Sequence, residues 1–428
     1  MKTIYLLMTL WIAWGCTKQP MPSPCLYPDC RDTVKWVFHR PDSFGIMPVQ
    51  WYTLGHTPDT SHCAEICFSV PEGVIAIRPL ANGLKPRAYV RLLDRETGEE
   101  IWYWDKMPVD HYTHYQYYPE RNMILVKYWY YDAILDISTG QEMLYEKEPK
   151  ELWYKATIGA IIGDYYYTSV YYESNSPTDT SDYAQLIRMK LGTSGQWEKV
   201  FTRYENTTKG YSSAFYNIGY WINPYTQDSI ILINDRLSMR NGAWKERSDV
   251  VAYNLSQRRV EWTIDSICKV SDLGDFIIDD NYMYFNEGRQ LSKIDLVNPQ
   301  VKIYSYTDFG GYGIIDKPNN RMIGFSLGIS SCALDHKEVY WKWDEPDFGG
   351  NGLELFEGYI YTQDDGGDLY VFNASTGKIV FQHFSQAMFV PQSILGMDGR
   401  CSVDKEHRLL YAADKYGVYC MKLPEKWE

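Results

Sequence analysis

The clearest signal for the fold lies in residues 90–102, which read Val90-Arg91-Leu92-Leu93-Asp94-Arg95-Glu96-Thr97-Gly98-Glu99-Glu100-Ile101-Trp102. An apolar run ends at Asp94, a Thr-Gly pair follows, and a second run carries Trp102. An Asp at the start of a turn can accept hydrogen bonds from its own backbone, and Gly98 can supply a positive φ. The stretch therefore predicts a β-hairpin whose aromatic residue packs between neighbouring sheets.

This hairpin recurs along the chain. Clear copies occupy residues 134–140 and 369–377, and weaker copies lie at residues 186–197, 251–262, 291–304 and 332–341. Upstream of the copies lie further strand-like runs, at residues 121–126, 228–233, 281–285, 358–362 and 408–412. Units of four strands that repeat about every 40 residues are the signature of propeller blades.

The last unit, at residues 408–423, stops after its third strand. Residues 33–40, which include Trp36, have the pattern of an outer strand with no blade of their own before them. We expect this N-terminal strand to complete the last blade, because closure removes an open sheet edge. The sequence therefore predicts an all-β fold, an eight-bladed β-propeller of four-stranded antiparallel blades over residues 33–428, with seven blades as the alternative.

Composition agrees with a strand-rich fold and restricts the class of partner. The 428 residues are 45% hydrophobic and 16% aromatic, with 38 Tyr and 15 Trp, which favours strands. The formal net charge is -13 and the chain has no basic tract, so neutralisation of a phosphate backbone is disfavoured. We expect no nucleic-acid partner.

The N-terminus indicates export. Residues 1–16 combine a basic start with a short apolar run and end in Gly15-Cys16, which is typical of a bacterial lipoprotein signal peptide. Ala13-Trp14 departs from the usual residues before the cysteine. Cys16 would become the acylated N-terminus and residues 17–32 a flexible tether. We expect a protein anchored to the cell envelope, at the outer membrane or facing the periplasm, by its lipid alone.

Eight cysteines follow Cys16, an even number for an oxidising compartment. The predicted disulfides are the local pairs Cys25 with Cys30, Cys63 with Cys67, and Cys401 with Cys420, with Cys268 and Cys332 unpaired and buried. A zinc site formed by His56, His62, Cys63 and Cys67 is the alternative for the second pair, although the spacing matches no standard zinc pattern.

The pattern strand, Asp-x-x-Thr-Gly, strand with Trp resembles the PQQ repeat of the quinoprotein alcohol dehydrogenase-like superfamily over residues 33–423. That resemblance implies a fold shared by quinone-dependent dehydrogenases and by non-enzymatic scaffolds of the outer membrane, so the site has to decide the function. The dehydrogenases carry adjacent cysteines near the quinone, and this chain has no Cys-Cys pair. We expect no cofactor.

Clusters of acidic residues are better interpreted as turns than as catalytic or metal sites. Residues 364–368, Asp-Asp-Gly-Gly-Asp, have oxygen ligands suited to calcium but the composition of a hairpin turn. Asp279-Asp280 has no His or Cys partner in a recognised catalytic spacing. We therefore assign no metal ligand and no catalytic residue.

Uneven blade length is the most informative feature for function. Asp94 and Asp136 lie 42 residues apart, whereas Lys190 and Asn254 lie 64 apart. The extra residues fall at 172–181, 204–216 and 237–247, where loops of one propeller face are expected to build a binding surface. The candidate binding residues are Tyr172, Tyr211, Tyr216, Trp221, Tyr225 and Trp244. The alternative is that these aromatic residues pack on the blades.

The sequence thus favours a non-catalytic propeller that binds an unidentified protein or glycan partner. The alternative function is a PQQ-dependent or carbohydrate-active enzyme that uses the central funnel.

Overall fold

The computed structural model describes residues 43–54, 66–78, 89–106, 113–128, 131–147, 154–155, 159–172, 183–204, 211–239, 247–268, 276–287, 290–305, 313–326, 328–343, 352–363, 368–383, 400–413 and 417–427. These residues form β-strands joined by turns, with two single-turn 3-10 helices, η2 (Pro119–Arg121) and η3 (Lys317–Asn319). No helix in these ranges is long and apolar enough to cross a membrane.

The described strands form eight antiparallel sheets, numbered here as blades in chain order. Blade 1 contains β3 (Ile66–Val70), β4 (Gly73–Arg78), β5 (Tyr89–Asp94) and β6 (Glu100–Trp104). Blade 2 contains β7 (Thr113–Tyr118), β8 (Met123–Tyr128), β9 (Tyr131–Asp136) and β10 (Glu142–Lys147). Blade 3 contains β11 (Tyr154–Lys155), β12 (Ala160–Ile162), β13 (Tyr165–Tyr172), β14 (Tyr183–Lys190) and β15 (Glu198–Tyr204). Blade 4 contains β16 (Tyr211–Ile222), β17 (Ser229–Met239), β18 (Arg247–Asn254) and β19 (Arg259–Cys268).

The second half of the chain repeats this plan. Blade 5 contains β20 (Phe276–Asp279), β21 (Tyr282–Glu287), β22 (Gln290–Asp295) and β23 (Gln300–Ser305). Blade 6 contains β24 (Gly313–Asp316), β25 (Arg321–Ser326), β26 (Gly328–Ala333) and β27 (Val339–Trp343). Blade 7 contains β28 (Glu354–Phe356), β29 (Tyr359–Gln363), β30 (Leu369–Asn373) and β31 (Ile379–His383). The predicted all-β, eight-bladed propeller is confirmed, and the seven-bladed alternative is wrong.

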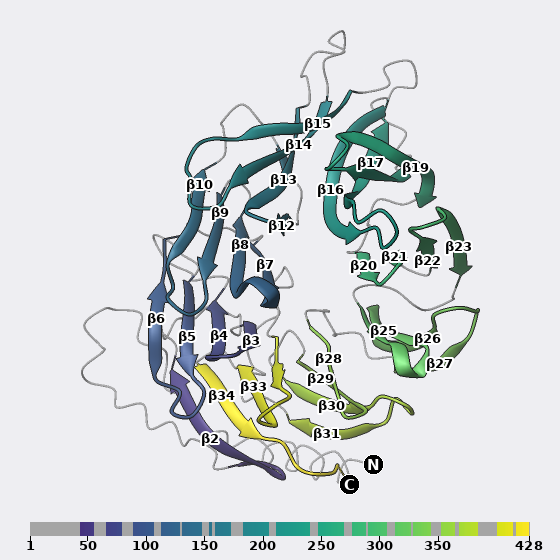
Figure 1. Ribbon diagram of the computed structural model, residues 1–428. Helices are drawn as coiled ribbons and strands as arrows, with labels where there is room; N and C mark the ends of the chain where they lie inside the picture. Colours follow the sequence, from purple (N-terminus) through teal and green to yellow (C-terminus); the bar gives the residue numbers. More distant parts are fainter. Residues whose placement is uncertain are drawn as a thin grey trace, which may run out of the picture. The chain divides into compact units, whose positions relative to one another are not determined.

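Blade 8 joins the two ends of the described chain. It contains β32 (Ser402–Asp404), β33 (Leu409–Ala413), β34 (Gly417–Lys422), β2 (Met47–Leu54) and β1 (Ser43–Phe44). In Figure 1 the purple strand β2 lies beside the yellow strand β34, and Thr53 pairs with Val418. Closure by an N-terminal strand is therefore confirmed.

The residues assigned to that closing strand need correction. Residues 33–40, with Trp36, lie outside the described residues, and β2 occupies the place beside β34 that they were predicted to fill. The burial of β2 alternates along its first half, and Trp51 is its buried aromatic residue. A second outer-strand pattern therefore followed the predicted one a few residues later, and the sequence did not distinguish the two.

The core lies between neighbouring blades. One buried cluster combines Ile75 and Leu92 of blade 1 with Val126 and Leu135 of blade 2. Since each sheet packs on a neighbour at both faces, its inner strands are buried on both faces, as in β26, all six of whose residues are buried. The apolar runs of the repeat thus become the seams between blades.

The Asp-x-x-Thr-Gly segments form the predicted turns. Oδ1 of Asp94 accepts hydrogen bonds from the backbone N–H groups of Glu96 and Thr97. Gly98 has a φ of +71°, and a Cβ there would lie 2.5 Å from the ring of Trp51. The Nε1 of Trp51 donates to the carbonyl of Arg95 at 2.7 Å. The outer-strand tryptophan of one blade thus packs on the turn of the next, and the same donation joins Trp102 to Ile137 and Trp341 to Ala374.

Candidate binding face

The sheets have two distinct ends. The loop end is the end at which the second strand of a blade connects to the third, and the fourth strand connects to the next blade. The turn end is the opposite end, where one turn joins the first strand to the second and another joins the third strand to the fourth. In blade 3, Tyr172 pairs with Tyr183 beside the connection at residues 173–182. In blade 4, Tyr211 pairs with Met239 beside the connection at residues 240–246. Residues 205–210 join the same ends of the two blades, so the connections within all three predicted insertions start and finish at the loop end, whereas residues 211–216 and 237–239 belong to strands β16 and β17.

The candidate aromatic residues do not all share this end. Tyr172 is the last residue of β13 and Tyr211 is the first residue of β16, so both lie at the loop end. Trp244 lies outside the described residues. Tyr225 is 78% exposed but lies in the β16–β17 hairpin, at the turn end. Trp221 is 5% exposed and packs in the core between blades 4 and 5. The candidate residues therefore do not form a single surface, because Tyr225 lies at the other end of the sheet and Trp221 is buried.

The reason is that the inserted residues of blade 4 lengthen strands as well as loops. Strand β16 has 12 residues and β17 has 11, whereas β29 in blade 7 has 5. A 12-residue strand spans about 40 Å, so its two ends reach opposite sides of the sheet. Tyr216 consequently lies within β16 rather than in a loop.

A charged cluster holds blade 3 to blade 4 near the loop end. Nη1 of Arg203 in β15 lies 2.6 Å from Oδ2 of Asp235 in β17, and Nη2 donates to Oδ2 of Asp249 in β18 at 3.0 Å. Both aspartate side chains are 0% exposed, and that of Arg203 is 27% exposed. Because a buried carboxylate requires a paired charge, Arg203 ties the outer strand of blade 3 to two inner strands of blade 4.

A second buried polar cluster joins blade 2 to blade 3. Nζ of Lys127 in β8 donates to Oγ1 of Thr168 in β13 at 2.7 Å. The hydroxyl of Tyr166 in β13 donates to Oδ2 of Asp132 in β9 at 3.1 Å. Burial lowers the pKa of Lys127 and raises that of Tyr166. Both seams of blade 3 are therefore cross-linked by polar side chains.

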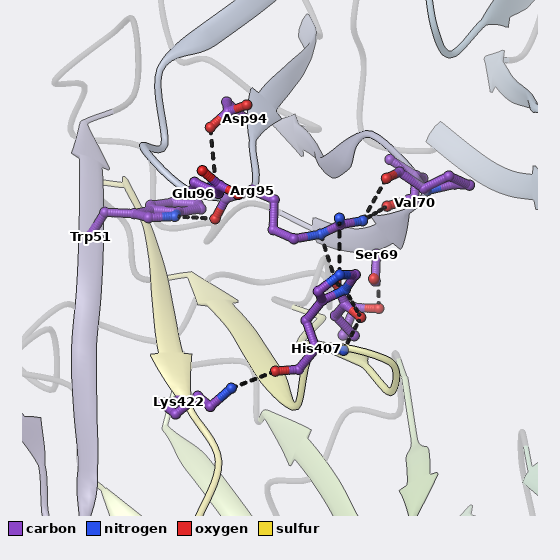
Figure 2. Close-up of polar contacts among 11 residues, drawn as sticks. Trp51, Ser69, Val70, Asp94, Arg95, Glu96, His407 and Lys422 are labelled. Atoms are coloured by element: carbon purple, nitrogen blue, oxygen red, sulfur yellow. Dashed lines mark hydrogen bonds and ion pairs between the residues drawn. The ribbon is translucent and has the colours of Figure 1, made fainter.

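A polar cluster at the turn end joins the two blades that close the ring. Figure 2 shows Arg95, from the β5–β6 turn of blade 1, reaching His407 in the β32–β33 turn of blade 8. Nε of Arg95 lies 2.9 Å from Oδ2 of Asp404, and its Nη2 donates to the carbonyl of Val70. Lys422 donates from Nζ to the carbonyl of His407 (Figure 2). These contacts join the first blade to the last, so the cluster acts as a closure clamp.

The predicted disulfide between Cys401 and Cys420 does not form, and both residues are buried thiols. Ser402, next to Cys401, pairs with Tyr411, which pairs with Cys420, so the two cysteines lie two strands apart. That is about 9.5 Å, beyond the reach of a disulfide. They also face different seams, since Cys401 packs with Val403 and Cys420 with Trp51.

Several other predicted features lie outside the described residues. These are Cys16, Cys25, Cys30, Cys63, His56, His62 and residues 364–367. Cys67 and Cys332 are buried, and the backbone of Cys268 lies in β19. Within the described ranges, His, Cys, Asp and Glu side chains form no group of three or more suited to a metal ion.

Sequence reasoning missed the buried charges of blades 2 to 4. Lys127 and Asp235 come after apolar runs, Asp249 comes before one, and none of the three belongs to a motif. The only signal in the sequence is the two-residue spacing of a strand: Asp235 lies two residues after Ile233, on the same face of β17.

Comparisons with known proteins agree with the fold. The sequence matches no protein-family model and no curated protein. BamB from Moraxella catarrhalis is similar in structure, with a TM-score of 0.53 and 14% identity over 88% of this chain and 99% of that chain. A europium-containing methanol dehydrogenase has a TM-score of 0.58 and 10% identity, covering 87% of this chain and 85% of its own. Sqt1 from Saccharomyces cerevisiae has a TM-score of 0.55 and 9% identity over 87% and 98%. All three neighbours are below 25% identity, so they show the β-propeller fold alone.

Proposed function

We propose that this chain is an exported, lipid-anchored β-propeller that binds a protein or glycan partner in the cell envelope, without catalysis, through the loop end of blades 3 and 4. The observation that carries the proposal is the convergence of the connections at residues 173–182, 205–210 and 240–246 on that end. Extended loops on a rigid scaffold are a common way to build a binding surface.

Two structural features support this assignment. The cluster of Arg203, Asp235 and Asp249 fixes blade 4 against blade 3 near the loop end. The pair formed by Lys127 and Thr168 fixes blade 3 against blade 2 in the same way. A surface presented by fixed blades loses little conformational freedom on binding, which favours affinity.

The export and anchoring parts of the proposal rest on residues 1–16. A Cys16→Ala variant should be released from the membrane fraction of the native host, because its N-terminus could no longer be acylated. Unchanged membrane association of that variant would contradict the lipid anchor and leave the binding face to be tested separately.

The binding face is tested by replacing residues 173–182 and 240–246 with short Gly-Ser turns. Capture of the native envelope partner should be lost, while the unfolding transition should shift little, because loop length has a weak effect on stability. Tyr225→Ser is the matched control, since Tyr225 is exposed at the turn end and should not affect capture. Full capture by the loop variant would refute the assignment.

The alternative that the protein is a quinone-dependent enzyme can be tested by measuring its melting temperature with and without added PQQ and calcium. Selective binding of either to the folded state would raise the melting temperature. We expect no shift; an increase of several degrees would favour a quinone-dependent enzyme instead.

A further inference from the structure

The seam between blades 4 and 5 changes from apolar to polar toward the loop end. Leu232 in β17 packs with Met283 and Phe285 of blade 5. Asn234, two residues later on the same face of the strand, is 0% exposed, and Ser248 of β18 is 2% exposed. Asn217 and Ser292 are also buried, and by strand alternation and register they face the same seam.

Two of these residues have unsatisfied polar atoms. Neither Nδ2 nor Oδ1 of Asn234 has a hydrogen-bond partner, and Oγ of Ser248 has none. Each of these atoms is shielded from solvent. Native proteins leave very few buried polar atoms without partners, and where such atoms occur an internal water commonly satisfies them.

The β16–β17 ladder is interrupted beside Asn234 and the β18–β19 ladder beside Ser248, whereas the β17–β18 ladder between them is regular. The β16–β17 register shifts between Phe215 and Asn217, which leaves Tyr216 as the extra residue. The β18–β19 register shifts between Ser248 and Val250. Bulges of this kind bend strands and re-aim side chains, and they recur beside functional sites.

Other seams show how buried polar residues at second-strand positions are normally satisfied. Ser169 of blade 3 donates to the carbonyl of Phe215 in blade 4. Gln363 of blade 7 donates from Nε2 to the carbonyl of Ala413 in blade 8, and its Oε1 accepts from the N–H of the same residue. Asn234 has a side chain one methylene shorter than Gln363 and makes no such contact.

We infer that the seam between blades 4 and 5 is an internal hydration site, in which ordered water bridges Asn234 and Ser248. Water suits the site because it both donates and accepts hydrogen bonds, as the amide of Asn234 requires. The described polar residues Asn217, Asn234, Ser248 and Ser292 are neutral, so the site favours a neutral ligand over an ion. This inference is independent of the proposed partner.

A high-resolution crystal structure of the protein provides the direct test. Ordered water should appear at roughly 2.7–3.2 Å from the amide of Asn234. A seam in which that amide instead contacts protein atoms, with no water beside it, would overturn the inference.

Substitution provides a second test that does not depend on crystals. Asn234→Leu and the milder Ser248→Ala should each lower the folding equilibrium constant, by about tenfold, because each removes a partner of the bound water. The double variant should lose no more than the larger single loss, since both residues bind the same water. Single variants as stable as the parent protein would contradict the inference, because removing dry, unpartnered polar groups should not destabilise the fold.

Discussion

The seam that closes the ring and the seam between blades 3 and 4 are both held by an arginine, but at opposite ends. Arg95 joins blade 8 to blade 1 at the turn end, where it contacts Asp404 and the carbonyl of Val70. Arg203 joins blade 3 to blade 4 near the loop end, where its two carboxylate partners are fully buried. The closure clamp maintains the ring, whereas the buried cluster fixes the surface from which the insertions leave.

The largest expected effect is on the closure seam. Trp51→Ala should destabilise the protein by about 4 kcal/mol, because a buried indole leaves a cavity. It also removes the hydrogen bond to Arg95. Chemical denaturation measures the loss, and Tyr225→Ala, at an exposed turn position, should change stability by less than about 0.5 kcal/mol. Equal effects of the two substitutions would show that β2 does not close the ring.

The buried cluster between blades 3 and 4 should give the next largest effect. Arg203→Met removes the cation beside Asp235 and Asp249, and should cost about 3 kcal/mol. Adding Asp235→Asn and Asp249→Asn to this variant should recover much of the loss, because the buried negative charges are then removed. A destabilised triple variant, no better than Arg203→Met alone, would show that packing rather than charge holds this seam.

A smaller effect is expected at the turn of blade 1. Asp94→Ala removes the acceptor for two backbone N–H groups and should cost about 1 kcal/mol. Asp94→Asn is the matched control, because Asn373 accepts the equivalent bonds in blade 7. Comparable losses in the two variants would assign the effect to charge rather than to the turn.

The same turn predicts a pH dependence. The hydrogen bond donated by the backbone N–H of Thr97 holds the pKa of Asp94 below its ordinary value of 3.8. Because the folded-state pKa is lowered, this stabilisation is complete above pH 3.8 and is lost as the pH falls through the folded pKa. Asp94→Asn should therefore lose less stability than the parent protein under acid conditions.

The fold could be predicted from sequence because its signals are local and repeated. Asp94, Thr97 and Gly98 specify one turn, and the same pattern at residues 134–140 and 369–377 specifies its repetition. The closing strand was assigned to the wrong residues because Trp36 and Trp51 lie in similar patterns. Only pairing with β34 distinguishes them, and that pairing joins residues far apart in the chain.

The candidate site could be predicted only in part for the same reason. The insertions were visible as spacing, and their connections leave at the predicted positions. Trp221 and Tyr225 were misplaced because sequence spacing does not show whether an insertion extends a strand or a loop. The ion pairs of Arg203 join residues 32 and 46 positions away, with no motif to connect them.

The central claim is that the loop end of blades 3 and 4 binds the partner, and site-specific photo-crosslinking in the native host tests it most directly. A crosslinking residue at position 176 or 243, in the two insertions, should capture the same envelope component. The same residue at position 225, on the exposed turn of blade 4, should capture nothing. Capture from position 225 with none from the insertions would contradict the claim.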